Sequence, residues 1–144
     1  MSFPDDNRRL DTACRFIATC RTLARSLTAA LRDYDFSETE FRLLWLVRER
    51  MADSEDASIE QSALADQSGI SPAQVSAIVE KLRIQQVLTP VTDNNDRRRQ
   101  LWQLTPSGRE RLEPIVTTVG LQSRGWVFSD LIDARIASQR EDAA

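Results

Sequence analysis

Histidine is absent from this chain of 144 residues, and glycine and cysteine are scarce, with four and two residues. Without histidine, the chain lacks the usual ligand of a zinc site and the commonest general base. It also carries no nucleophile elbow, no glycine-rich phosphate loop and no cluster of metal-ligating residues. We therefore expect a protein that is not an enzyme and that uses neither a metal nor a cofactor.

Long hydrophobic runs are absent as well. No segment approaches the roughly eighteen consecutive apolar residues of a membrane-spanning helix, and the first residues do not combine a basic start with an apolar core. The hydrophobic fraction of 41% is still sufficient for a packed core. The sequence predicts a soluble, cytoplasmic protein of one small domain with helical extensions and no membrane partner.

Cys14 and Cys20 lie six residues apart in a segment predicted to be helical. This spacing separates them by about 9 Å along the helix axis, whereas a disulfide tolerates Cα separations of roughly 4.4–6.8 Å. The two thiols therefore cannot bridge within that helix. They are interpreted either as small apolar residues in an interface, or as a redox-sensing thiol or a bridge between two chains of a dimer.

The net charge of −3 is unevenly distributed along the chain. Residues 71–111 hold seven basic and four acidic side chains, a local charge of +3, whereas residues 51–70 hold five acids and no base. Affinity for DNA depends on the local field where the phosphates dock. A mildly acidic total is therefore compatible with a basic DNA-facing surface.

The two ends of the chain have the apolar periodicity of amphipathic helices. In residues 5–34 one face carries Leu10, Cys14, Ile17, Ala24, Leu27, Leu31 and Tyr34. After Gly120 a second such face carries Trp126, Phe128, Leu131, Ile132 and Ile136. The first helix, on the order of 40 Å long, cannot bury its stripe against a small module alone. We expect it to pack with the last helix and with a second copy of the chain.

Helix signals also divide the middle of the chain. Ser37-Glu38-Thr39-Glu40 is a capping box that opens a helix to about Arg50, and an exposed acidic loop follows at residues 52–56. A third helix is predicted over residues 61–67, with Gly69 just after its end. These signals indicate a compact helical module.

The motif Ser71-Pro72-Ala73-Gln74 is the clearest helix start. It places serine at the N-cap, proline at the first helical position and glutamine at the third. The residues predicted to be buried are Val75, Ile78, Val79 and Leu82. Those predicted to face outward are Ala73, Gln74, Ser76, Ala77, Glu80 and Lys81.

A β-hairpin with a basic tip is predicted next. Residues 88–93 and 99–104 have the pattern of two strands, and the turn between them ends in Arg97, Arg98 and Arg99. Thr105-Pro106 then opens a helix to about Val119. The aromatic side chains of Phe41, Trp45, Trp102, Trp126 and Phe128 are interpreted as core residues rather than as a ligand cage.

This order of elements matches a winged helix-turn-helix. The motifs that carry a closer resemblance are Leu64-Ala65-x-x-x-Gly69-Ile70-Ser71, Val79-Glu80-Lys81-Leu82, Asp96-Arg97-Arg98 and Leu104-Thr105-Pro106-Ser107-Gly108. Together, in this order, they resemble the MarR family of transcriptional regulators. The resemblance is strongest over residues 36–112.

The resemblance implies a mainly α fold with a small β-wing. Residues 36–105 would form the winged helix-turn-helix DNA-binding domain, and residues 1–35 and 106–144 a helical dimerisation region. It further implies a homodimer that binds a pseudo-palindromic operator in double-stranded DNA, usually as a repressor. Many members release DNA when a small, often aromatic, effector occupies a cleft, and others sense oxidants through a cysteine in the N-terminal helix.

The resemblance also identifies candidate DNA-binding residues. On the recognition helix and its cap these are Ser71, Pro72, Ala73, Gln74, Ser76, Ala77 and Lys81; on the wing they are Arg97, Arg98 and Arg99. In the family the arginine matching Arg98 enters the minor groove, and Asp96 matches the position that orients it. By side-chain chemistry, Gln74 suits an adenine edge, and the methyl groups of Ala73 and Ala77 suit a thymine methyl. Lys81 and Arg83 suit phosphates.

Three positions depart from the family pattern. Ala77 stands where many members have arginine, Gln86 where glycine is common, and Pro90 where arginine is common. The recognition helix is therefore poor in positive charge. This feature, with the acidic residues between Asp53 and Asp66, leaves a second interpretation open: a winged helix used for protein–protein assembly. A thiol-based sensor would be a variant of the regulator.

Overall fold

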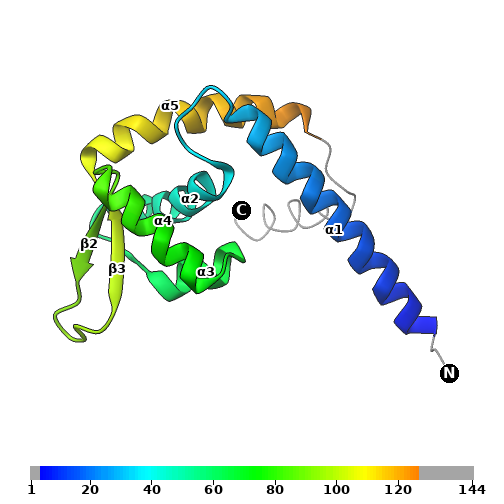
Figure 1. Cartoon of the computed structure of the whole chain (residues 1–144), viewed down its shortest axis with the longest axis horizontal. Helices are drawn as coiled ribbons and strands as arrows, with labels where there is room; N and C mark the ends of the chain where they lie inside the picture. The colour runs from blue at the N-terminus through cyan, green and yellow to red at the C-terminus, as the bar shows by residue number, and fades with distance from the viewer. Residues whose placement is uncertain (1–3, 127–144) are drawn as a thin grey trace. The chain divides into compact units, whose positions relative to one another are not determined.

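The computed structural model describes residues 4–126. The chain forms two compact units, one of residues 1–33 and 119–144 and the other of residues 34–118 (Figure 1). The described elements are α1 (Pro4–Ala30), α2 (Glu38–Ala52), β1 (Ile59–Glu60), α3 (Gln61–Ser68), α4 (Pro72–Ile84), β2 (Leu88–Thr92), β3 (Gln100–Leu104), α5 (Pro106–Gln122) and a short 3-10 helix, Ser123–Gly125. The fold is mainly helical with one small antiparallel sheet, as predicted.

Helix α1 provides most of the described part of the first unit. Asp5 and Asp6 lie in its first turn, where the helix dipole favours negative charge. None of its residues is buried in the described structure, and Leu10 and Ile17 are 64% and 53% exposed. The N-terminal half of the predicted apolar stripe is therefore uncovered by the part of the chain that the structure describes, whereas Leu27 is half-buried and Leu31, just after α1, is buried.

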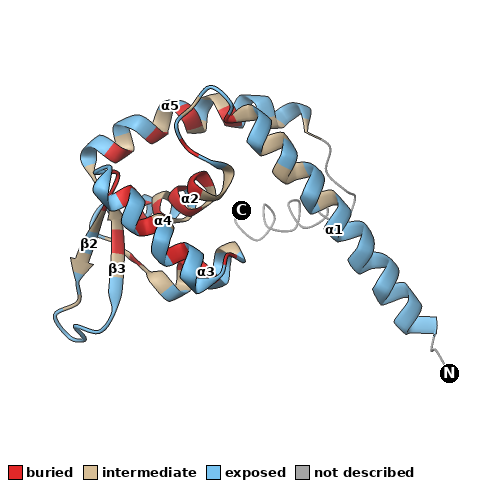
Figure 2. Cartoon of the chain, viewed as in Figure 1, coloured by how far each residue is buried: buried red, intermediate tan, exposed pale blue. Residues whose placement is uncertain are grey.

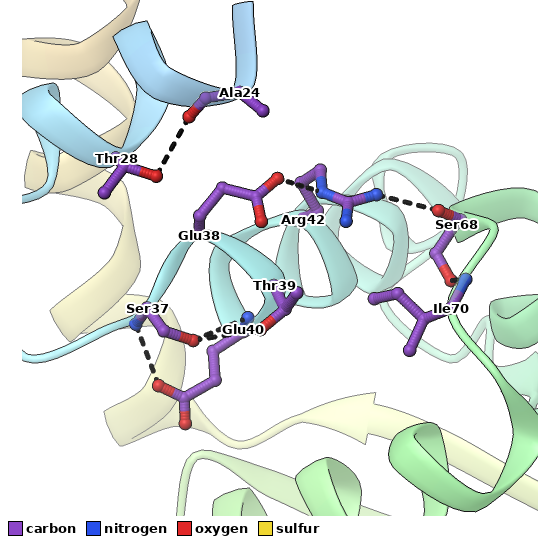
Figure 3. Close-up of polar contacts among 9 residues, drawn as sticks. All are labelled: Ala24, Thr28, Ser37, Glu38, Thr39, Glu40, Arg42, Ser68 and Ile70. Carbon is purple, nitrogen blue, oxygen red and sulfur yellow. Dashed lines mark hydrogen bonds and ion pairs between the residues drawn. The ribbon is translucent and has the colours of Figure 1, made fainter. Parts of the chain in front are cut away.

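In the second unit, α2 begins at the predicted capping box (Figure 3). The hydroxyl of Ser37 accepts the backbone N–H of Glu40 at 3.1 Å, and Oε1 of Glu40 accepts the backbone N–H of Ser37 at 2.8 Å. Arg42 forms an ion pair with Glu38 and donates to the carbonyl of Ser68 at 2.7 Å. The first turn of α2 is thereby closed and linked to the end of α3.

Helices α3 and α4 form the helix-turn-helix. Gly69, with φ of 70°, ends α3 in the left-handed conformation that favours glycine. Ser71 then caps α4, because its hydroxyl accepts the backbone N–H of Gln74 at 3.2 Å. Both signals were readable in the sequence, and both predicted helices are present.

The elements of this unit enclose one core (Figure 2). Its least exposed side chains are Leu43, Leu44, Val47, Leu64, Val75, Leu82, Val87 and Leu112. On α4, Val75, Val79 and Leu82 are buried as predicted, and Ile78 is half-buried at the edge. Burying this stripe determines which face of α4 points to solvent.

The aromatic residues divide between core and surface. Phe41 and Trp102 are buried as predicted, and the indole N–H of Trp102 donates to Oε1 of Gln61 at 3.0 Å. The prediction was wrong for Trp45, which is 39% exposed because it lies on the solvent side of α2, where the guanidinium of Arg48 covers its ring at 5.3 Å. Trp126 is half-buried. Phe128 and the rest of the predicted last helix lie outside the described residues.

The sheet contains a strand that the sequence did not reveal. Ile59 pairs with Trp102 and Glu60 with Leu101, which places β1 beside β3 in the order β1-β3-β2. Two residues are too few to show a strand periodicity, so this pairing depends on the tertiary fold. It brings Glu60 to the loop end of the β2–β3 hairpin.

The junction between α4 and β2 packs closely on the start of α5. A side chain at Gly108 would place its Cβ only 2.2 Å from the carbonyl oxygen of Val87, so only glycine fits there. Ser107 donates to the carbonyl of Gln86 at 3.1 Å, and the hydroxyl of Thr105 accepts the N–H of Gly108 at 2.8 Å. Gln86 itself has a φ of 61°, in the left-handed region that favours glycine. This is the position at which glycine is common in the MarR family that the sequence resembles.

We predict that Gln86→Gly raises the free energy of unfolding by roughly 0.5–1 kcal/mol. A left-handed non-glycine residue costs about 1–2 kcal/mol, and the greater freedom of glycine in the unfolded chain offsets part of the gain. Gln85→Gly is the matched control, because Gln85 has an ordinary φ of −76° and should lose stability. Urea unfolding followed by circular dichroism measures both, and a loss of stability in both variants would contradict the prediction.

Candidate nucleic-acid interface

The predicted recognition-helix residues share the solvent face of α4. Pro72, Ala73, Gln74, Ser76 and Ala77 are all exposed, as is the capping residue before them. Between the cap and residue 79 the helix carries no charged side chain. The side chains that these turns present to a ligand are therefore mostly small, uncharged and partly apolar.

Lys81 is tied to α2. Its ammonium lies 2.9 Å from Oε2 of Glu40, whose side chain is only 5% exposed. Burial pushes the pKa of Glu40 upward, but the hydrogen bonds from Ser37 and the Lys81 charge outweigh it, so this pKa lies below its ordinary value of 4.5. The carboxylate therefore stays charged at neutral pH and joins the capping box of α2 to α4.

We predict that Glu40→Gln lowers the free energy of unfolding at pH 7 by roughly 1–3 kcal/mol, because it removes charge-assisted hydrogen bonds from a buried group. The folded-state pKa of Glu40 is lowered, so its stabilisation is present above the unfolded pKa and is lost as the pH falls through the folded value. The difference from wild type should therefore shrink below about pH 4.5.

Glu110→Gln is the control for this comparison. Glu110 is exposed on α5 and forms no ion pair with any residue between 4 and 126, so its loss should leave stability nearly unchanged. Chemical unfolding at several pH values measures both variants. A pH-independent difference between wild type and Glu40→Gln would show that the charge of Glu40 is not the cause.

Arg83 is also paired within α4. Its guanidinium binds both carboxylate oxygens of Glu80, at 2.6 and 2.9 Å. This hydrogen bonding lowers the pKa of Glu80 and raises that of Arg83. Both side chains remain about half exposed, so water and salt screen the pair. The cations of the last turns of α4 are thus each matched by an acid.

The hairpin of β2 and β3 forms the wing (Figure 1). The strands pair from Leu88 with Leu104 to Thr92 with Gln100, and the connecting loop extends beyond the helices of this unit. Two aspartates order that loop: Oδ1 of Asp93 accepts the N–H of Asn95 at 2.9 Å, and Oδ1 of Asp96 accepts the N–H of Arg98 at 3.0 Å. We call residues 93–99 the wing tip.

The three arginines of the wing tip differ in their surroundings. Arg98 has a 98% exposed side chain, and its Nε lies 3.9 Å from Oδ1 of Asp96, so Asp96 orders mainly its backbone. Arg97 is exposed and has no ion-pair partner in the described part of the chain. These two guanidiniums are presented to solvent at the end of the hairpin.

Arg99, by contrast, is held by two acids. Its guanidinium lies 3.0 Å from Asp93 and 3.2 Å from Glu60. The pKa of Asp93 is lowered chiefly by the backbone N–H of Asn95, with Arg99 contributing. Arg99 therefore links the wing tip to β1, a role that its place in an arginine run did not reveal.

The remaining candidate residues lie elsewhere. Cys14 and Cys20 are free, exposed thiols on α1, in the other unit. No group of three potential metal ligands occurs within residues 4–126. No helix in that range is long and apolar enough to cross a membrane.

Comparison of the whole chain with solved structures gives extensive matches. AbsC from Streptomyces coelicolor, a MarR family transcriptional regulator, superposes with a TM-score of 0.70 over 96% of this chain and 91% of its own, at 15% identity. The chain has the MarR-type winged helix-turn-helix fold. No family profile and no curated protein matches the sequence.

Two further proteins with the MarR-type fold were solved with ligands. CouR from Rhodococcus jostii RHA1, bound to p-coumaroyl-CoA, matches with a TM-score of 0.70 and 18% identity over 92% of this chain and 91% of its own. A mutant of MarR from E. coli complexed with operator DNA matches with a TM-score of 0.67 and 16% identity, over 93% and 95% of the two chains. At these identities the likeness concerns the fold.

Sequence reasoning missed two residues of the candidate interface, Glu40 and Glu60. Glu40 was identified only as part of a capping box, and Glu60 only as one acid in an acidic stretch. Their basic partners, Lys81 and Arg99, lie 41 and 39 residues further along the chain, so no local pattern signals either pair.

Proposed function

We propose that the chain is a homodimeric DNA-binding transcriptional regulator, acting as a repressor on a pseudo-palindromic operator. The observation that carries the proposal is the pairing, in one unit, of a capped helix with an exposed neutral face and a wing with two solvent-exposed arginines. A helix of this kind suits the major groove, and an arginine on a hairpin suits the narrow, electronegative minor groove. A protein of the same fold, MarR from E. coli, was solved with operator DNA.

In this proposal the residues have distinct roles. Ser71 and Pro72 begin α4 at the groove, while Ala73, Gln74, Ser76 and Ala77 face the bases. Arg97 and Arg98 contact the DNA backbone or minor groove, and Asp96 orders the loop that presents Arg98. Lys81 is positioned by Glu40 and Arg99 by Glu60. Each of these cations would contact a DNA phosphate while it remains paired with its carboxylate.

We predict that Arg98→Ala weakens operator binding by roughly 1–3 kcal/mol and reduces the salt dependence of binding by about one phosphate contact per subunit. The reason is that its guanidinium is nearly fully exposed, so its charge is available to DNA. Fluorescence anisotropy with duplexes tiling the DNA upstream of its own gene, at two salt concentrations, measures both effects.

Arg8→Ala is the control for charge. Arg8 is an exposed residue of α1, in the other unit, and its loss changes the net charge by the same amount. It should leave the affinity and its salt dependence close to wild type. Equal losses in the two variants would mean that the wing makes no specific contact.

Dimerisation is the second part of the proposal, through residues 1–35 and 106–144. The exposed N-terminal half of the apolar stripe of α1, with Leu10 and Ile17, supports it, because a helix with such a stripe gains stability by burying it against a partner. We predict that Ile17→Asp converts the dimer to monomer, whereas Thr12→Asp, on the opposite face of α1, does not. Sedimentation velocity measures both, and a dimer that survives Ile17→Asp would exclude this face.

A dimer of this kind should protect two half-sites. Because the recognition helices of a two-fold dimer enter successive major grooves on one face of the duplex, the half-site centres should lie about one helical turn, or roughly 10 bp, apart. A hydroxyl-radical footprint on the bound duplex tests this spacing. One isolated protected segment would contradict a two-fold complex.

Effector control is a further expectation from the fold. CouR was solved with p-coumaroyl-CoA, an aromatic acyl thioester, and BpsR from Bordetella bronchiseptica is described as regulated in its DNA binding by 6-hydroxynicotinic acid. By analogy, a small aromatic molecule would release this regulator from DNA. The exposed thiols of Cys14 and Cys20 support oxidant control as the alternative, and peroxide treatment of wild type and Cys14→Ser separates the two.

A protein-interaction module is the second candidate function. The observation that favours it is the pairing of Lys81, Arg83 and Arg99 with acids, which reduces the charge left for phosphates. A pull-down that recovers a stoichiometric protein partner covering the wing tip would support this function. The protein should then show no salt-dependent affinity for any duplex.

A further inference from the structure

The solvent face of α4 carries an apolar line. At about 100° per residue, Ala77 and Ile84 lie roughly 40° and 20° around the helix from Ala73, opposite the buried stripe. All three side chains are exposed, and Ile84 is 68% exposed. Nothing in the core requires these positions to be apolar, so their chemistry is available to whatever α4 contacts.

The groups that would read guanine or cytosine are missing from this face or already engaged. Guanine is read by arginine or lysine and cytosine by a free carboxylate. The first two turns of α4 contain neither, and both oxygens of Glu80 are bound by Arg83. Lys81 is held at 2.9 Å by a carboxylate from α2.

Gln74 is the exposed side chain near the start of α4 that can discriminate a base, since the hydroxyl of Ser76 can bond to any of them. An amide of glutamine can donate to and accept from an adenine edge at the same time. Its Oε1 lies 3.2 Å from the hydroxyl of Ser71, which holds the side chain at the exposed end of the helix beside Ala73. The side chains of Gln74, Ala73 and Ala77 are all exposed on the first turns of α4.

We propose that α4 reads A·T base pairs, with the methyl groups of Ala73 and Ala77 packed on thymine methyls and Gln74 on an adenine. The proposal rests on the proposed function, since it specifies the operator that this regulator binds. Guanine and cytosine contribute no favourable contact to α4. Sequence preference then comes from apolar contact and one amide, while the wing tip supplies affinity through charge.

The first experiment is selection of bound duplexes from a random library by the full-length protein, at two salt concentrations. The expected result is enrichment of two half-sites whose central positions are A·T pairs. Half-sites with invariant G·C pairs at those positions would overturn the A·T inference and leave the regulator intact. Absence of salt-dependent binding to any duplex would overturn both.

The second experiment isolates the methyl contact. Deoxyuridine replaces thymidine at the enriched positions, which removes only the methyl group. Each contacted methyl should cost wild type roughly fourfold in affinity, the effect expected for exposing one buried methyl. The ratio of the two affinities should approach one in the double variant Ala73→Gly/Ala77→Gly, and it should stay at the wild-type value in the control Ala63→Gly on α3.

Comparing two duplexes within one variant cancels any loss of helix stability caused by glycine. Equal binding of the two duplexes by wild type, or a ratio unchanged in the double variant, would overturn the proposal. A second variant covers the case in which the double variant does not fold. Ala77→Arg should shift the selected half-site toward guanine, because it adds the missing guanidinium, and an unchanged half-site would also overturn the proposal.

Discussion

The buried carboxylate of Glu40 ties helix α4 to the start of helix α2. It accepts the backbone N–H of Ser37, which completes the cap of α2, and it binds the ammonium of Lys81 on α4. Burial alone would favour the protonated form, yet these donors keep the pKa below its ordinary value. One group thus joins two helices that the chain separates by a turn, a strand and a third helix.

A second set of ion pairs determines which cations remain available. Arg99 is held by Glu60 and Asp93, so it links the hairpin to β1, while Arg98 remains almost fully exposed at the wing tip. In the proposed function this division separates two tasks. The wing would supply electrostatic affinity, and the neutral face of α4 would supply sequence preference, because methyl groups and one amide read bases without attracting phosphates.

Much of the fold could be predicted because its signals are local. Capping by Ser37 and Ser71 depends on residues within three positions, and Gly69 is required by a backbone angle, so each is readable from the sequence alone. Trp45 was wrongly predicted to be in the core. Helix α2 carries apolar residues on several sides, and periodicity alone does not determine which of these sides packs against the rest of the unit. The strand β1 was missed because its two residues pair only with a partner some 40 residues away.

The sequence by itself determined the order of the helices and of the two hairpin strands, the buried stripe of α4 and the neutral chemistry of its other face, since all of these follow from short-range periodicity and capping. Only the tertiary structure decided which charged residues pair across distant segments. Lys81 is held by Glu40, and Arg99 gains Glu60 as a second acid beside the nearby Asp93; both Glu40 and Glu60 approach from distant segments. Salt screens the interaction of exposed charges beyond roughly 8–10 Å at physiological ionic strength, and distances shorter than this are established by folding, not by spacing along the chain.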